Sequence, residues 1–175
     1  MAKRVPAIVL IASLIALAAC SAGSSSSGTA KPCAGSMPGS TSRDAVSTWC
    51  SAYGAILVNG KGYTLYASSA DTANKSACAS SCAAIWPPLA VSGVPKLGPG
   101  LNKSLVGDVI RAGGSHQLTY GGHPLYAYRA DTGPHLVNGQ RLKSFGGTWY
   151  VVSATTGKLI TKKPSTKHKG NGPGY

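Results

Sequence analysis

The chain carries a tyrosine and an aspartate at the same spacing in two places. Tyr66 precedes Asp71 by five positions, and Tyr126 precedes Asp131 by the same five. A carboxylate beside an aromatic ring can bind a cation or a hydrogen-bond donor of a ligand, with the ring as a flat contact surface. The same carboxylate can instead accept backbone N–H groups of the turn that follows a strand. We favour this structural interpretation and keep the ligand-binding interpretation as the alternative.

These residues belong to a longer stretch that occurs twice. Residues 65–72 read LYASSADT, and residues 125–132 read LYAYRADT. Each copy follows a glycine and precedes a tryptophan that opens an apolar run, Trp86 in the first and Trp149 in the second. A duplication of this kind predicts one structural unit used twice, with repeat one at about 54–93 and repeat two at about 114–157.

Turn signals place both copies of the motif in β-hairpins. In repeat one, Asn59-Gly60 separates an apolar run from a β-prone run that leads into Tyr66. In repeat two, Gly121-Gly122 separates two similar runs. Turns of Asn and Gly between apolar runs are typical of hairpins. Because side chains alternate along a strand, Leu125 and Tyr126 are expected on opposite faces, with both faces covered.

The alanine-rich stretch 74–85 predicts one short helical turn, which Pro87-Pro88 ends because proline restricts the residue before it to extended conformations. Elsewhere short β-prone runs alternate with turn residues. We therefore predict an all-β single domain of two related hairpin-based repeats, arranged as a small sandwich or barrel. The domain is expected over 52–160, after a flexible tether and polar loop over 20–51 and before a basic disordered tail over 161–175.

The first nineteen residues are predicted to be an export signal. Lys3 and Arg4 precede an apolar run over 5–16, which is shorter than the roughly 20 residues needed to span a bilayer. The segment Leu17-Ala18-Ala19-Cys20 resembles the lipobox of bacterial lipoproteins, and that resemblance implies cleavage before Cys20 and its lipidation. Two or more acyl chains would anchor the protein stably. The alternative is an ordinary signal peptide with an incidental cysteine.

Four cysteines remain once Cys20 is set aside: Cys33, Cys50, Cys78 and Cys82. In an exported protein, four cysteines predict two disulfides with three possible connectivities. We favour Cys33–Cys50 and Cys78–Cys82. The alternative for Cys78 and Cys82 is a redox couple or a soft-metal site, because thiolates select copper(I) and zinc. No methionine or histidine lies within ten residues of this pair to complete a ligand set.

The charge is strongly positive. Seventeen lysines and arginines face four acids, all of them aspartate, and the formal net charge is +13. A basic tail can bind nucleic acid, but an exported protein meets none, so we expect no nucleic-acid partner. Anionic envelope polymers or lipid head groups are the partners expected for the tail, beside the membrane contact through Cys20. A solvated tail without a specific partner is the alternative.

Three histidines and the scarcity of acids bear on catalysis. His116, His123 and His135 lie within twenty residues, and histidine can ligate haem or copper. Their Ser, Gly and Pro neighbours place them in turns, where exposed histidines are ordinary, so we predict no metal and no cofactor. We also predict that the protein is not an enzyme, because four aspartates without a glutamate argue against a carboxylate pair for glycoside hydrolysis, and a Gly-x-Ser-x-Gly elbow is absent.

Several motifs in combination resemble a known family. Residues 126–131 carry Tyr-x4-Asp with an aromatic, Tyr128, two positions after the tyrosine, whereas the first copy has Ser68 at that position. The pair Cys78-x3-Cys82 ahead of Trp86, and Gly-x-Trp-Tyr-x-Val over 147–152, complete the pattern. With these motifs the chain resembles the secreted-repeat lipoproteins of unknown function, which are defined by Tyr-x4-Asp. The resemblance implies an export route and no established role.

Together these features predict an exported, lipid-anchored protein on the extracytoplasmic face of the cell membrane. Its expected role is a non-enzymatic binding or scaffolding module whose ligand the sequence does not name. The alternative is an envelope redox or metal- or haem-handling protein that acts through Cys78 and Cys82.

Overall fold

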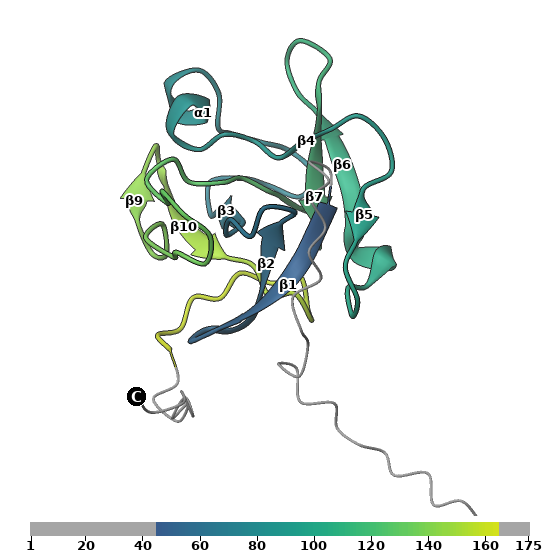
Figure 1. The fold of residues 1–175 in the computed structure, drawn as a ribbon. Helices are drawn as coiled ribbons and strands as arrows, with labels where there is room; N and C mark the ends of the chain where they lie inside the picture. Colours follow the sequence, from purple (N-terminus) through teal and green to yellow (C-terminus); the bar gives the residue numbers. More distant parts are fainter. Residues whose placement is uncertain (1–44, 165–175) are drawn as a thin grey trace, which may run out of the picture.

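The computed structural model describes residues 45–164 (Figure 1). The predictions for the export signal, for Cys20 and Cys33, for the tether up to residue 44 and for the tail from residue 165 concern residues outside this range. The elements are β1 (Ala45–Ser51), β2 (Gly54–Asn59), β3 (Tyr66–Ser68), α1 (Ser81–Ile85), β4 (Ala90–Val91), β5 (Lys96–Leu97), the 3₁₀ turn η1 (Lys103–Leu105), β6 (Val106–Ile110), β7 (His116–Tyr120), β8 (His123–Pro124), β9 (Lys143–Ser144) and β10 (Gly147–Val151).

The strands form three small sheets, which confirms the all-β prediction. Their orders are β2-β1-β5, β3-β10-β9 and β4-β7-β6, with β8 also paired to β7. The β4–β7 group lies on one side of the molecule and β9–β10 on the other, with β1–β3 between them (Figure 1). The strands of residues 45–164 do not close into a barrel, so of the two predicted arrangements the barrel is wrong.

The polar loop predicted up to residue 51 is wrong for residues 45–51. These residues form β1, which pairs antiparallel with β2 from Val46 opposite Asn59 to Ser51 opposite Gly54. Val46 is fully buried in one core while Trp49 packs against the other, so β1 alternates between two covered faces. Serine and threonine between these residues hide the apolar pattern, although short and β-branched side chains suit a strand.

Both predicted hairpins are confirmed. In repeat one, the side chain of Asn59 accepts the backbone N–H groups of Lys61 and Tyr63, each at 3.0 Å, and this closes the turn. In repeat two, Gly121 and Gly122 have φ of 61° and 79°, the left-handed values that a two-residue hairpin turn needs at both positions. The β7–β8 register then places Tyr120 opposite His123.

The expected alternation of the motif strands is also confirmed. Leu65 and Leu125 lie in one hydrophobic core, and Tyr66 and Tyr126 lie in the other, on the opposite face of the same strands. All four side chains are fully buried. The motif segments therefore form the wall between the two cores, and each copy contributes to both.

The predicted helical turn is α1, between the motif of repeat one and its tryptophan. The N–H of Trp86 donates to the carbonyl of Cys82 at 2.8 Å and completes the last turn. Pro87 follows at once and cannot continue the helix. The short helix thus delivers Cys82 and Trp86 to the second core, where both are buried.

Candidate functional site

The two motif tyrosines meet at the centre of the domain. The N–H of Tyr66 donates to the carbonyl of Tyr126 at 2.8 Å, and the N–H of Tyr126 donates back to Tyr66 at 2.9 Å. This reciprocal pair is an antiparallel bridge between equivalent positions of the two repeats. Antiparallel pairing of equivalent residues relates their backbones by a local two-fold axis. The repeats are therefore halves of one interlocked unit.

The side chains pair across the repeats. The Tyr66 hydroxyl of repeat one donates to Asp131 Oδ2 of repeat two at 2.7 Å. The other oxygen, Oδ1, accepts the N–H of Asn138 at 3.0 Å, and the N–H of Gly139 donates to the tyrosine oxygen at 3.3 Å. Asp131 is 3% exposed. Burial, with the bonded carboxylate second, raises the pKa of the Tyr66 hydroxyl, which therefore stays protonated as a donor.

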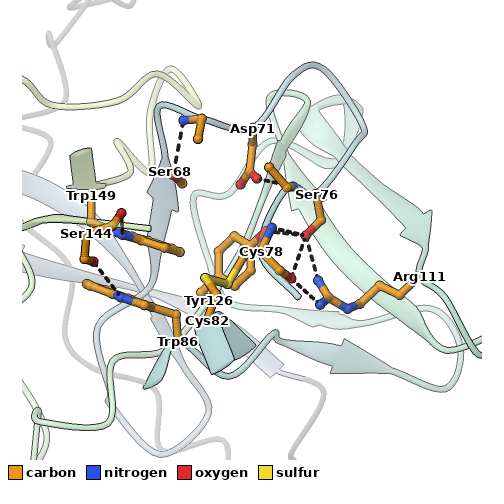
Figure 2. The surroundings of a disulfide bond; sticks show 12 residues. Ser68, Asp71, Ser76, Cys78, Cys82, Trp86, Arg111, Tyr126, Ser144 and Trp149 are labelled. Atoms are coloured by element: carbon orange, nitrogen blue, oxygen red, sulfur yellow. Dashed lines mark hydrogen bonds between the residues drawn. A yellow bond between two sulfur atoms is a disulfide. The ribbon is translucent and has the colours of Figure 1, made fainter. Parts of the chain in front are cut away.

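The other half of the arrangement differs. Asp71 is half-buried, its Oδ1 accepts the N–H of Ala77 at 2.7 Å, and its buried Oδ2 has no hydrogen-bond partner within the described residues. Burial raises the pKa of Asp71, partly offset by its hydrogen bonds. The Tyr126 hydroxyl donates instead to Ser76 Oγ at 2.7 Å (Figure 2). Burial raises the pKa of Tyr126 to about 12, with the Asp71 charge as a smaller cause in the same direction.

Ser76 accepts the tyrosine hydroxyl in this half, as the Asp131 carboxylate does in the other. Its Oγ also accepts Arg111 Nη1 at 2.7 Å, and the same guanidinium donates to Gln117 Oε1 at 2.6 Å and to the carbonyl of Cys78. Figure 2 shows Arg111 reaching this cluster beside the disulfide. Sequence reasoning missed this network because its members are spread over more than forty positions and none repeats.

A stack of aromatic rings connects the two halves. Trp86 and Trp149 follow equivalent positions of the repeats, and their rings stack with centroids 3.8 Å apart and planes 2° apart. Each motif tyrosine meets the tryptophan of its own repeat edge-on, Tyr66 at 5.5 Å and Tyr126 at 5.0 Å. Edge-to-face and stacked contacts of this kind stabilise by about 0.5–1.5 kcal/mol each. In the sequence, the feature that indicates this tryptophan contact is the recurrence of a tryptophan after each motif.

The aromatic residue that distinguishes the second copy joins this stack. Tyr128 stacks on the face of Trp86 with centroids 4.2 Å apart, so Trp86 lies between Tyr128 and Trp149. At the equivalent position Ser68 is buried in β3 opposite Trp149, and its Oγ accepts the N–H of Ala70 at 3.1 Å. Of the predicted site residues, the structure thus brings Tyr66, Tyr126, Tyr128 and Asp131 together, and half-buried Asp71 lies beside the Tyr126 hydroxyl.

Cys78 and Cys82 form the predicted disulfide, with Cα atoms 5.2 Å apart. Both residues are buried, at 4% and 5% exposure, against the tyrosines and tryptophans of the second core. Thiol–disulfide exchange needs direct attack of a thiolate on one sulfur, and burial blocks that approach in the folded domain. Cys50 lies in β1, and its predicted link to Cys33 involves a residue outside the described range.

The three histidines do not form a common site. His116 and His123 lie in β7 and β8, so their expected placement in turns is wrong. His123 adopts strand geometry because the Gly121-Gly122 turn is only two residues long, and His116 does so because it pairs with Val91 and Ile110. His116 is exposed and bonded to Asp108, while His135 stacks on Trp49 at 4.7 Å. Burial lowers the pKa of His123, against the raising effect of the Asp71 charge. Within residues 45–164, no three histidine, cysteine or acidic side chains are grouped so as to hold a metal ion.

Fold and site together define an all-β domain built from two interlocked repeats whose Tyr-x4-Asp segments pair at its centre. A family model described as a secreted repeat of unknown function matches the chain over residues 47–90 and again over 107–153. The chain belongs to this family of secreted repeats. The matched segments start in β1 and β6, each of which pairs antiparallel with the strand that leads into the hairpin turn of its repeat, β2 and β7. No curated protein and no solved structure matches the chain.

Membership of a secreted family fits a module that works outside the cytoplasm. Among the helices of residues 45–164, none has the length and apolar character required to cross a membrane.

Proposed function

We propose that this protein is an exported, lipid-anchored module of the cell envelope that binds partners rich in phosphate or other anionic groups, without catalysis. The observation that carries the proposal is the charge of the domain. Residues 45–164 hold eleven lysines and arginines and three aspartates. A surface with this excess attracts anionic polymers and head groups over distances of about a Debye length.

The aspartates leave this positive charge uncompensated. Asp131 is buried against Tyr66, Asp71 is half-buried at the edge of the core, and Asp108 is bonded to His116. No lysine or arginine of the described range forms an ion pair with any of them. The acids therefore serve the fold or a histidine. Arg111 is bonded within the Ser76 cluster, and the other lysines and arginines of residues 45–164 are exposed and available to an external anion.

Two further features support an envelope location. The family is one of secreted repeats, and the segment ending in Cys20 resembles a lipobox. A lipid anchor would hold the domain at a membrane whose anionic lipids attract basic residues, by about 1 kcal/mol for each lysine or arginine near the surface.

The anchor is tested by fractionation of cells that produce the full chain. Cys20→Ser is expected to move the protein from the membrane fraction to the soluble one, because the apolar run 5–16 is too short to hold it. Ser25→Ala in the tether is the matched control and should stay with the membrane. Retention of the Cys20→Ser protein after a high-salt wash would refute the anchor.

The partner class is tested with the mature chain carrying Cys20→Ser, so that no acyl chain contributes. Binding to a poly(glycerol phosphate) and to vesicles containing phosphatidylglycerol is compared with binding to a neutral dextran and to neutral phosphatidylcholine vesicles. We expect binding to at least one anionic probe that weakens as salt is raised. Absence of binding to both anionic probes at low salt would refute an anionic partner.

A further inference from the structure

The loop between β4 and β5 presents an apolar tip. Val94 is 96% exposed, the highest value among the large exposed apolar side chains of residues 45–164. A single exposed valine is ordinary on a protein surface. Val94 does not stand alone, however, because Pro95 follows it and apolar grooves lie on both sides of the pair.

The two grooves make the tip part of a continuous apolar face. One groove, of about 510 Å³, runs between the loop and β6–β7; the other, of about 550 Å³, runs between the loop and η1. Val94, Pro95 and Val106 line both. Contiguous exposed apolar surface of this kind marks an interaction site more often than scattered apolar residues do.

The rim of this face is positively charged. Lys96 and Lys103 line the second groove, and both residues are exposed. The first groove contains one acid, Asp108, and the neighbouring His116 is bonded to it. In an anionic membrane surface, phosphates lie above the acyl chains. An apolar tip flanked by lysines fits this arrangement, because the tip can contact the acyl chains while the lysines contact the phosphates.

The path of the chain places this face next to the tether. β1 pairs parallel with β5, with Ala45 opposite Lys96. The segment that leads from Cys20 therefore enters the domain beside the apolar tip. The Ser- and Gly-rich composition of residues 20–44 predicts a flexible tether, and twenty-five residues of that kind would span about 28 Å on average, which would keep an anchored domain within reach of the membrane.

We propose that the face formed by Val94, Pro95, Lys96 and Lys103 docks on an anionic lipid bilayer, with the valine and proline entering the head-group layer and the lysines contacting phosphates. This inference rests on the proposed function, because it specifies where and to which anionic partner the module binds. The anchor at Cys20 and this face then hold the domain in one orientation, with β9 and β10 directed away from the membrane (Figure 1).

Vesicle co-sedimentation of the mature chain carrying Cys20→Ser tests the docking face. With vesicles containing phosphatidylglycerol, Val94→Ser is expected to lower the partition coefficient about tenfold or more. Lys96→Gln and Lys103→Gln are each expected to lower it about fivefold. Val94→Leu should raise it. Since these side chains are exposed, all four variants should keep the parent's melting temperature.

Matched controls lie at the opposite end of the domain. Phe145 is 47% exposed in the turn between β9 and β10, and Lys143 is nearby. Phe145→Ser and Lys143→Gln remove the same kinds of group as the test variants. They should change the partition coefficient less than twofold if docking is confined to the Val94 face.

The outcomes distinguish failure of the docking face from failure of the proposed function. If the parent binds anionic vesicles and none of the Val94, Lys96 and Lys103 variants changes this binding by more than twofold, the docking face is wrong. The proposed function is then unaffected. Binding to poly(glycerol phosphate) but not to anionic vesicles leads to the same conclusion. If the Phe145 and Lys143 control variants lose as much vesicle binding as the test variants, binding depends on general charge and apolarity, and the docking face is again wrong. No binding to either anionic probe refutes both.

Discussion

Replacement of Asp131 by alanine tests whether the motif aspartate holds the fold. The variant loses two hydrogen bonds, one from the Tyr66 hydroxyl at 2.7 Å and one from the N–H of Asn138 at 3.0 Å. Asn138 is exposed, so its N–H can find water, whereas Tyr66 is fully buried. A buried donor left without an acceptor costs about 1–3 kcal/mol.

The loss of the Tyr66 acceptor therefore dominates the expected effect. We expect Asp131→Ala to lower the free energy of unfolding by about 3 kcal/mol, which for a domain of this size lowers the melting temperature by about 10 °C. Asp131→Asn keeps one carbonyl oxygen and should cost about half as much. Chemical denaturation and thermal melts at pH 7 measure both.

Asp71→Ala is the matched control, because Asp71 occupies the equivalent position of the other repeat. Its Oδ1 accepts the N–H of Ala77, which is exposed, and its carboxylate lies beside the Tyr126 hydroxyl, whose proton goes to Ser76. Removal should cost about 1 kcal/mol or less. The repeated motif by itself predicts equal responses at both aspartates, whereas the different contacts of the two carboxylates predict a larger loss at Asp131.

A double-mutant cycle attributes the effect to the cross-repeat pair. Tyr66→Phe removes the donor that Asp131→Ala leaves unpaired, so the two changes should be non-additive, with a coupling of about 1–2 kcal/mol. An additive cycle would show that the buried pair contributes nothing specific. Unchanged melting of both Asp131→Ala and Asp71→Ala would refute the structural interpretation of the motif and favour the ligand-binding one.

Three further changes test other contacts. Burial raises the pKa of Asp71 above its usual 3.8, so the folded domain binds this proton more tightly than the unfolded chain does. The free energy of unfolding therefore falls as pH rises through the raised pKa. Asp71→Asn should remove this fall, which urea denaturation between about pH 3 and 6 would measure. A Cβ at Gly139 would lie 2.7 Å from the Trp86 ring, so Gly139→Ala should cost about 1–3 kcal/mol in thermal melts, whereas Gly133→Ala, with nothing within 4 Å, should not. The Cys78→Ser, Cys82→Ser double variant should lose about 2 kcal/mol, and an unchanged denaturation midpoint would refute a structural disulfide.

The local elements of the fold were predictable because short-range chemistry decides them. Asn59-Gly60 and Gly121-Gly122 supply the turn conformations that a hairpin requires. Strand periodicity placed Leu125 and Tyr126 on opposite faces, as observed. β1 escaped prediction because its serines and threonines carry no clear apolar alternation, and its partners β2 and β5 are what cover it.

The sequence by itself determined that a tyrosine, an aspartate and a tryptophan recur at matching positions, and hence that one structural unit occurs twice. Only the tertiary structure decided that Tyr66 bonds to Asp131 and not to Asp71, and that Trp86 stacks on Trp149. The spacing within one copy says nothing of this, because the contacts join residues more than sixty positions apart across the Tyr66–Tyr126 bridge. The same packing left Ser76, and not Asp71, to accept the Tyr126 hydroxyl. Duplicated residues keep equal roles only where the packing around both copies is equal, and here only one aspartate is enclosed by the partner repeat.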